Sequence, residues 1–294
     1  MNKLSNIKAL AFDMDGTLLR ADKTLSGRTL AALGDCMAGG IKVILSTGRG
    51  VQSAEPYRKA IGTEGPQVYY NGAEVMNMPS GKIIHVHLLD PAPVKFCLKL
   101  AREKGLYLQV YFPSGAVPAG MLSPENVPAA AGACAGEILL TEKLGPESEY
   151  YLKNSGLQAI AGNVEETLSL PGLPGIIKSM FITEEKEQEP LRDAISGRFG
   201  DSVTIVRSSP IYLEVLAKGV SKGDGLVHAL AYMDIDPKNA IAFGDEENDL
   251  SMFAAAGYSA APANAVKEAL EAASFRIPSN VEDGVAAFLE EKIL

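Results

Sequence analysis

Two aspartates directly follow a short apolar segment near the N-terminus. Residues 7–12 are almost all apolar, and Asp13 and Asp15 come next, just before Gly16. Such a run, stopped by an acid and a glycine, is typical of a strand buried on both faces of a parallel sheet. Because side chains two apart share a face of a strand, the two carboxylates could bind one cation, for which Mg²⁺ is well suited. An acidic strand-to-turn junction without a ligand is the alternative for this pair alone.

Two further apolar segments also end in polar residues. They are residues 41–45 and 239–243. The polar residues that follow them are Thr47, Asp245, Asn248 and Asp249. If the three segments are parallel neighbours, these side chains meet at the edge of the sheet where α/β proteins bind ligands.

The chemistry of this set points to a phosphoryl group. Carboxylates at one edge imply a metal ion, whereas Lys222, a hydroxyl and a helix N-terminus imply an anion that the metal also binds. A carboxylate can attack phosphorus and form an acyl phosphate that water hydrolyses, while a neighbouring acid handles the proton. The sequence therefore predicts a site for phosphoryl transfer.

The remaining sequence supplies elements that could position these residues. Helices are predicted at residues 26–39, 51–60, 93–104, 187–199, 222–233, 248–256, 266–273 and 282–292. Further strands are predicted at residues 67–70, 73–76, 82–88, 106–112, 176–183, 203–207 and 211–216, with a hairpin turn at Pro79-Ser80-Gly81. Residues 113–136 are rich in alanine, glycine and proline and are predicted to form a long loop.

The spacing of the polar residues indicates an inserted domain. Thr47 and Lys222 are 222 − 47 = 175 residues apart, whereas one βαβ unit takes about 30 residues. We therefore expect an α/β protein with a Rossmann-like parallel-sheet core, formed by residues 1–88 and 211–294. Residues 89–210 would form an inserted α+β domain that could close over the site and select the substrate.

Composition narrows the possible partners. The chain has 294 residues, a net charge of −9 and a pI of about 5.0, which disfavours binding to nucleic acid or an anionic membrane. Three widely spaced cysteines (Cys36, Cys97 and Cys134) do not suggest a disulfide framework. The N-terminal apolar run is too short for a signal peptide, and prolines interrupt the uncharged residues 105–124. We expect a cytoplasmic protein, and its oligomeric state is left open.

Four sequence motifs carry a family resemblance. They are Asp13-Met14-Asp15-Gly16-Thr17, Ser46-Thr47-Gly48-Arg49, Gly219-Val220-Ser221-Lys222-Gly223 and Gly244-Asp245-Glu246-Glu247-Asn248-Asp249. In this order they resemble the motifs of the haloacid dehalogenase superfamily. The insertion point, Asn264-Ala265 and residues 282–285 are similar to the Cof-type sugar-phosphate phosphatases, whose inserted domain is of the C2B kind. The resemblance covers about residues 7–88 and 211–290 of the core.

The resemblance implies a role for each residue. Asp13 would be the nucleophile and a Mg²⁺ ligand, and Asp15 the general acid and base that also offers its main-chain carbonyl to the metal. Asp245 would be a second carboxylate ligand, and Asp249 would support the metal's waters. The phosphate contacts would be the Met14 amide, Thr47, the Gly48 amide, Lys222 and Asn248.

The expected activity is thus Mg²⁺-dependent hydrolysis of small phosphorylated metabolites, with sugar phosphates as the expected class. A sugar phosphomutase on the same scaffold is the alternative. A third hypothesis is a catalytically inactive protein that binds a phosphometabolite. Such proteins usually lack the nucleophile or a metal ligand, whereas Asp13, Asp15, Lys222 and Asp245 are all present here.

Several residues also have a purely structural interpretation. Thr47 could be a helix cap, Lys218 could replace Lys222, and Arg49 could contact substrate or pair with a core acid. Asn71, before Gly72, is typical of a turn.

The three histidines (His85, His87 and His228) lack metal-ligand neighbours in the sequence, so they are expected to be structural or surface groups.

Overall fold

The protein is described by a computed structural model over residues 3–113, 139–155, 157, 159–170 and 175–294. The chain forms two compact units. The first comprises Met1–Arg49, Ala54–Val86 and Ser221–Leu294, and the second comprises Gly50–Ser53 and His87–Val220. None of the helices in the described ranges is long and apolar enough to cross a membrane. Apart from Pro113, the loop predicted at residues 113–136 lies outside the described residues.

The first unit is built on a sheet whose strands all run parallel. In spatial order β14-β13-β12-β1-β2, they are β14 (Phe275–Ile277), β13 (Tyr258–Pro262), β12 (Ala240–Phe243), β1 (Ala9–Phe12) and β2 (Lys42–Leu45). Strand β1 lies in register between β12 and β2, with Phe12 opposite Phe243 and Leu45. The prediction that the three apolar segments are parallel neighbours is therefore confirmed. The residues after them meet at one edge of the sheet.

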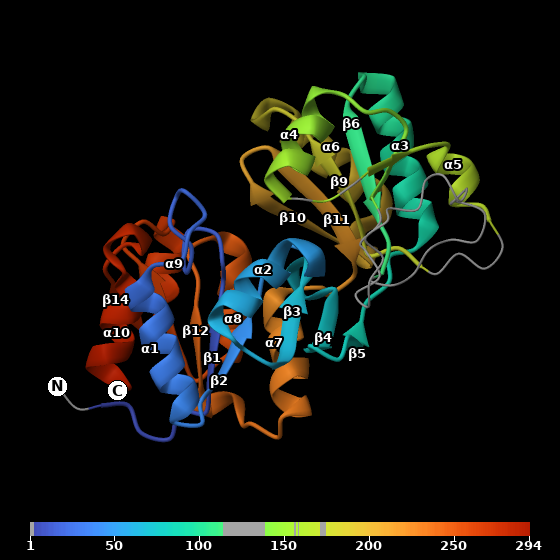
Figure 1. Ribbon diagram of the computed structural model, residues 1–294. Coiled ribbons are helices and arrows are strands. Elements are labelled where there is room, and N and C mark those ends of the chain that lie inside the picture. Colours follow the sequence, from blue (N-terminus) through green and yellow to red (C-terminus); the bar gives the residue numbers. More distant parts are fainter. Residues whose placement is uncertain (1–2, 114–138, 156, 158, 171–174) are drawn as a thin grey trace. The chain divides into compact units, whose positions relative to one another are not determined.

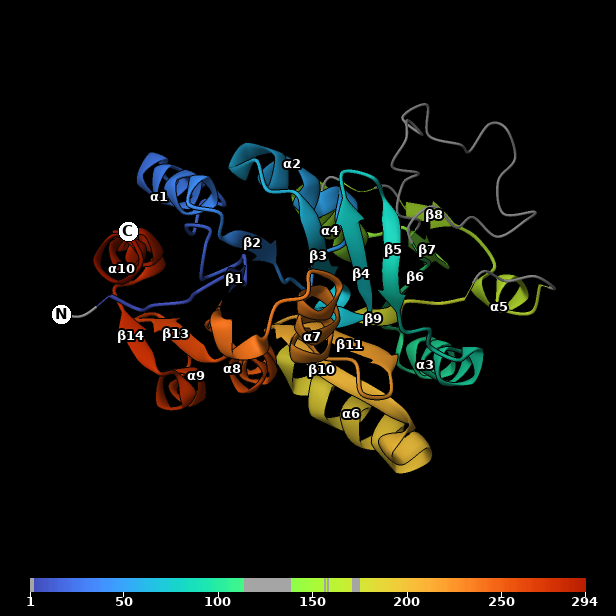
Figure 2. The same ribbon diagram turned by 90° about the horizontal axis from the view of Figure 1, so that it is seen from below.

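Helices cover both faces of this sheet. The helices of the first unit are α1 (Gly27–Ala38), α2 (Val51–Ile61, which belongs to this unit from Ala54 onward), α7 (Lys222–Tyr232), α8 (Leu250–Ala255), α9 (Lys267–Ala272) and α10 (Gly284–Lys292). Figure 2 shows α1 and α10 on one face and α8 and α9 on the other. The Ser26 side chain caps α1 by accepting a hydrogen bond from the Thr29 amide, as the sequence predicts.

A small antiparallel sheet completes the first unit. It consists of β3 (Gly65–Tyr69), β4 (Glu74–Met78) and β5 (Lys82–Val86), and it includes the predicted hairpin. A bridge between Ser46 and Val68 joins it to the end of β2. Helix α7 packs on it so closely that a Cβ on Gly225 would lie 2.5 Å from a Val68 methyl carbon. Glycine at this position therefore sets how near α7 comes to the sheet.

The second unit has its own mixed sheet (Figure 1). In spatial order β10-β11-β9-β6-β7-β8, its strands are β10 (Val203–Ser209), β11 (Tyr212–Ala217), β9 (Lys178–Ile182), β6 (Tyr107–Tyr111), β7 (Leu139–Thr141) and β8 (Ala159–Ala161). All pairs are antiparallel except β7 with β8. The sequence assigned residues from 211 onward to the core, but β11 pairs with β9 and β10, so this segment belongs to the second unit up to Val220.

Two long helices pack on one face of that sheet. The helices of the second unit are α3 (Pro91–Lys104), α4 (Pro146–Ser155), α5 (Val164–Thr167) and α6 (Glu185–Phe199). Leu98 of α3 and Leu191 of α6 share one apolar core with Val110 of β6. On the opposite face, Tyr151 of α4 packs edge-on against Tyr111 and Tyr212. The unit is therefore an α+β domain, as expected for the insertion.

Candidate active site

The centre of the site is a lysine held between two buried carboxylates. Lys222 is the first residue of α7, where the Ser221 side chain caps the helix by accepting the Asp224 amide. Its Nζ lies 2.6 Å from Asp13 Oδ1 and 2.6 Å from Asp249 Oδ1. Because Asp13 directly follows β1, the parallel sheet and the start of α7 fix this contact from opposite ends of the chain.

Asp249 is held in place through both of its oxygens. While Oδ1 accepts from Lys222, Oδ2 accepts from the main-chain amides of Asp245 at 2.8 Å and Glu246 at 3.0 Å. These hydrogen bonds connect Asp249 to the start of its own loop, which follows β12. Asp249 is therefore suited to position its neighbours.

Asp245 faces the loop that follows β1. Its Oδ1 accepts a hydrogen bond of 2.7 Å from the Thr17 hydroxyl, and a Cβ on Gly16 would come within 2.1 Å of its Oδ2. Gly16 also has a φ of +92°, so any other residue there would be both strained and in collision with Asp245. Thr17 therefore contributes to the site, and it was not predicted as a site residue although it lies within the first motif.

The donor set fits a hard divalent cation. Ligand atoms of Asp13, Asp245 and Asp249 all lie within 4.8 Å of one another, and all three residues are buried. Three carboxylates and one ammonium leave 3 − 1 = 2 negative charges when all are ionised, and burial makes such an excess costly. Oxygen donors of this kind suit cations such as Mg²⁺, Ca²⁺ or Mn²⁺.

The electrostatics of the cluster reflect its burial and its excess of negative charge. Burial raises the pKa of Asp13 well above its usual value, although Lys222 acts in the opposite direction. Burial and then the charge of Asp249 raise the pKa of Asp245 to about 7. Burial acts to lower the pKa of Lys222, but the charges of Asp13 and Asp249 outweigh it and raise that pKa. The lysine thus stays protonated, and a second cation beside the carboxylates would stabilise their ionised forms.

The side chain of Asp15 lies apart from this cluster in an ion-paired arrangement. It accepts from Arg49 Nε at 2.6 Å and Nη2 at 2.7 Å, and from Lys23 Nζ at 2.8 Å. Burial acts to raise the pKa of Asp15, but Arg49 and then Lys23 outweigh it and lower that pKa to about 2. Of the two roles left open for Arg49, the structure contains the pairing with an acid.

The predicted phosphate-contacting residues lie around the same edge. Thr47 follows the end of β2 and is buried, and its Oγ1 accepts the Arg49 amide at 3.1 Å, as a cap would. Asn248 donates from Nδ2 to Asn71 Oδ1 at 3.0 Å. Gly48 faces the same amide, because a Cβ there would lie 3.1 Å from Asn71 Oδ1. Met14 is buried.

Asn71 therefore does more than form a turn. It has the positive φ of 57° that the turn requires, and its side chain also orients Asn248. The Asn71-Gly72 pair signals the turn in the sequence, but nothing there reveals a partner 177 residues away.

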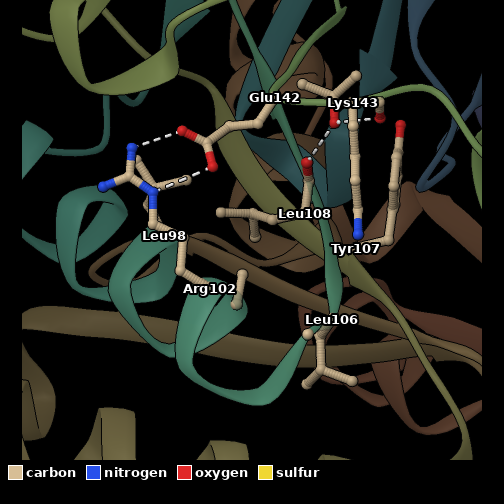
Figure 3. A pocket seen from close by; sticks show the side chains of 10 residues that line it. Leu98, Arg102, Leu106, Tyr107, Leu108, Glu142 and Lys143 are labelled. Carbon is tan, nitrogen blue, oxygen red and sulfur yellow. Dashed lines mark hydrogen bonds and ion pairs between the residues drawn. The ribbon is translucent and has the colours of Figure 1, made fainter.

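A pocket in the second unit offers a contrasting environment (Figure 3). It has a volume of about 150 Å³ and lies between α3, β6 and the end of β7. Arg102 lines it but is bound to Glu142 by two hydrogen bonds, of 3.0 and 2.5 Å, and to Glu165 at 2.6 Å. The pocket is smaller than the roughly 300–1,000 Å³ typical of ligand sites, and the charge of its arginine is already balanced.

Known proteins share both the sequence pattern and the fold. The family model described as haloacid dehalogenase-like hydrolase matches residues 10–289. YxeH of Bacillus subtilis (strain 168), whose phosphatase assignment is itself an inference, is 28% identical over 290 residues, covering 98% of each chain. The 5-amino-6-(5-phospho-D-ribitylamino)uracil phosphatase YitU of the same organism is 27% identical over 289 residues, covering 96% of each.

A solved structure agrees with these relatives. The haloacid dehalogenase-like hydrolase from Bacteroides thetaiotaomicron superposes with a TM-score of 0.79 at 26% identity, covering 97% of this chain and 98% of the other. Since the family model spans most of the sequence and the fold agrees, the chain belongs to the haloacid dehalogenase-like hydrolases, as a phosphatase of the Cof type.

Proposed function

We propose that the protein is a Mg²⁺-dependent phosphatase that hydrolyses small phosphorylated metabolites through an aspartyl-phosphate on Asp13. The observation that carries the proposal is the cluster of three buried carboxylates around a single lysine. Its net negative charge matches a divalent cation, and the cation and Lys222 together match a phosphate.

The metal ligands would be the carboxylates of Asp13 and Asp245 and the main-chain carbonyl of Asp15, with Asp249 supporting the metal's waters. A bound Mg²⁺ would neutralise charge on the phosphoryl oxygens and favour the ionised form of the carboxylates. The Met14 and Gly48 amides, Thr47, Lys222 and Asn248 would hold the transferring group. This assignment agrees with the position of Lys222 at a helix N-terminus, which attracts anions.

The chemical steps use the chain's own carboxylates. A carboxylate oxygen of Asp13 forms a bond to phosphorus while the ester oxygen leaves, and Lys222 stabilises the charge of the transferring group. Water then attacks the acyl phosphate, releases inorganic phosphate and restores Asp13. Asp15, kept ionised by Arg49 and Lys23, is suited to take the proton from that water. To protonate the leaving oxygen in the first step, Asp15 must gain a proton as the negative substrate raises its pKa.

Phosphorylated sugars and sugar alcohols are the substrate class we favour. The named substrate of the relative YitU carries a phosphoribityl group, and a small polar ester of this kind suits the site's charged groups. The net charge of −9 argues against nucleic acid as a substrate.

We place the enzyme in the cytoplasm, in keeping with the free, buried thiols of Cys36 and Cys97. We assign substrate selection to the inserted α+β unit.

Phosphate release from a panel of phosphorylated sugars, sugar alcohols, nucleotides and cofactors tests the proposal. We expect release with Mg²⁺ and none with EDTA, and no release by the Asp13→Asn variant under either condition. Accumulation of an isomeric sugar phosphate would indicate a phosphomutase instead. A folded protein that binds a panel member without turning it over would indicate a sensor.

A further inference from the structure

A second group of potential metal ligands lies away from the carboxylates, and three of its four members belong to the first unit. It consists of His85, His87, Asp224 and His228, whose ligand atoms all lie within 4.8 Å of one another. The group includes all three histidines of the chain. The expectation that they lack metal-ligand neighbours is therefore wrong, and we name these four residues the histidine cluster.

The fold brings the histidine cluster together from two elements. His85 lies in β5, the edge strand of the small sheet, and His87 follows the last residue of that strand. Asp224 and His228 are four residues apart on α7, so they share one face of the helix. Three of the four side chains (His85, Asp224 and His228) thus belong to elements packed within the first unit.

Helix α7 separates this group from the active site. With about 100° per residue, Asp224 and His228 lie roughly 200° and 240° around the helix from Lys222. Lys222 therefore faces the carboxylates, while Asp224 and His228 face the small sheet. One helix presents two chemically different sets of donors on its opposite sides.

The local geometry favours a bound cation. The His85 and His228 rings stack with centroids 3.5 Å apart and an angle of 12° between their planes, and His228 Nε2 lies 3.8 Å from Asp224 Oδ2. Ligands at about 2.0–2.1 Å from a metal lie up to about 4.2 Å from each other. Small side-chain rotations would therefore turn the cluster into a coordination sphere. All four residues are half-buried, so a cation could reach them from solvent.

We propose that the histidine cluster is a second metal site, which binds a divalent transition-metal ion of the Zn²⁺ type. Its three members in the first unit, the imidazoles of His85 and His228 and the carboxylate of Asp224, match the donors that Zn²⁺ prefers, whereas Mg²⁺ prefers oxygen ligands. The bound ion ties β5 to α7. This inference stands without the proposed phosphatase activity, because it uses none of the residues assigned to that reaction.

Nuclear magnetic resonance of the imidazole groups tests the site directly. Tag-free protein, stripped of metal and kept in excess Mg²⁺, is titrated with Zn²⁺. Since the chain has only three histidines, every imidazole signal belongs to the cluster. We expect the signals of His85 and His228 to shift and saturate at one Zn²⁺ per chain. Unchanged imidazole signals from folded protein at saturating Zn²⁺ would overturn the proposal.

Variants locate the binding independently. The double variant His85→Ala/His228→Ala should lose Zn²⁺ affinity by more than the roughly 10–100-fold that loss of an outer-shell partner costs. Asp224→Asn should weaken binding, whereas Glu271→Gln, which changes an exposed helical acid elsewhere in the first unit, should not. Asp13→Asn should keep full Zn²⁺ binding. If the folded double variant binds Zn²⁺ as tightly as the wild type, the site lies elsewhere and the proposal fails.

Discussion

Helix α7 contributes residues to two clusters that differ in burial and in charge. One is the histidine cluster, and the other is the carboxylate cluster, formed by Asp13, Asp245 and Asp249 around Lys222. Asp13, Asp245 and Asp249 are buried around an internal cation, Lys222, which already compensates part of their charge. The histidine cluster is half-buried and holds a single carboxylate. The first arrangement suits a hard cation together with an anionic ligand, and the second suits a borderline metal alone. Helix α7 thus has donors suited to a hard cation and an anion on one side, and donors suited to a borderline metal on the other.

The Asp13→Asn variant should give the largest difference between the two clusters, because it should abolish turnover without affecting Zn²⁺ binding. Removal of the nucleophile should lower kcat by at least about 10⁴-fold, as for other enzymes that lose a nucleophile, while Zn²⁺ uptake at the histidine cluster stays unchanged. Phosphate release and Zn²⁺ titration of the same preparation measure both. Turnover near the wild-type rate would remove Asp13 from the mechanism.

A large loss of stability is expected from Lys222→Met. The change leaves Asp13 and Asp249 buried without their shared cation, which costs about 3–5 kcal/mol for a broken buried ion pair. Urea unfolding in the absence of divalent metal measures this cost. Lys218→Met is the matched control, because Lys218 is exposed and lies four residues earlier. Equal stability and activity of the two variants would contradict the assigned role of Lys222.

A moderate effect is expected from pH on the metal-free protein. Because the pKa of Asp245 is raised to about 7 in the fold, the folded state keeps a proton that the unfolded state has lost above about pH 4. The contribution of Asp245 to stability should therefore fall as pH rises from about 4 to about 7. Thermal unfolding of wild type and Asp245→Asn isolates this contribution, and Mg²⁺ should abolish it. A wild-type minus variant difference that stays flat with pH would argue against the shift.

The smallest effect is expected from His85→Ala/His228→Ala on turnover. With saturating Mg²⁺, the rate of phosphate release should stay within about twofold of wild type, since neither histidine belongs to the carboxylate cluster. Steady-state assays measure it. A large loss of kcat in a folded variant would mean that the two clusters are coupled through α7.

The sequence was informative where polar residues directly follow strands. Asp13, Thr47 and Asp245 each come within two residues of a strand's end, and parallel register then brings them to one edge. Lys222 was predicted because it lies in the third of the four motifs that resemble the haloacid dehalogenase superfamily. These parts of the site could be predicted because local position in the chain determines position at the sheet edge.

Other features depended on packing that the sequence does not encode locally. The histidine cluster arises because β5 lies against α7, which brings His85 beside His228. Strands β13 and β14 are short and weakly patterned, so they were not predicted. Strand β11 was predicted as a strand but assigned to the wrong unit, because its partners β9 and β10 only become evident in the sheet.

The aspartyl-phosphate mechanism can be tested by detecting the phosphoryl group on Asp13. An Asp15→Asn variant lacks the base for the second step, and an aryl phosphate with a good leaving group needs no acid in the first. Mixing the two with Mg²⁺, quenching in acid and mapping peptides by mass spectrometry should give one added phosphoryl group on Asp13. It should be absent from Asp13→Asn/Asp15→Asn. Phosphate release by the single variant with no phosphoprotein, or with the phosphoryl group on another residue, would rule out Asp13 as the nucleophile.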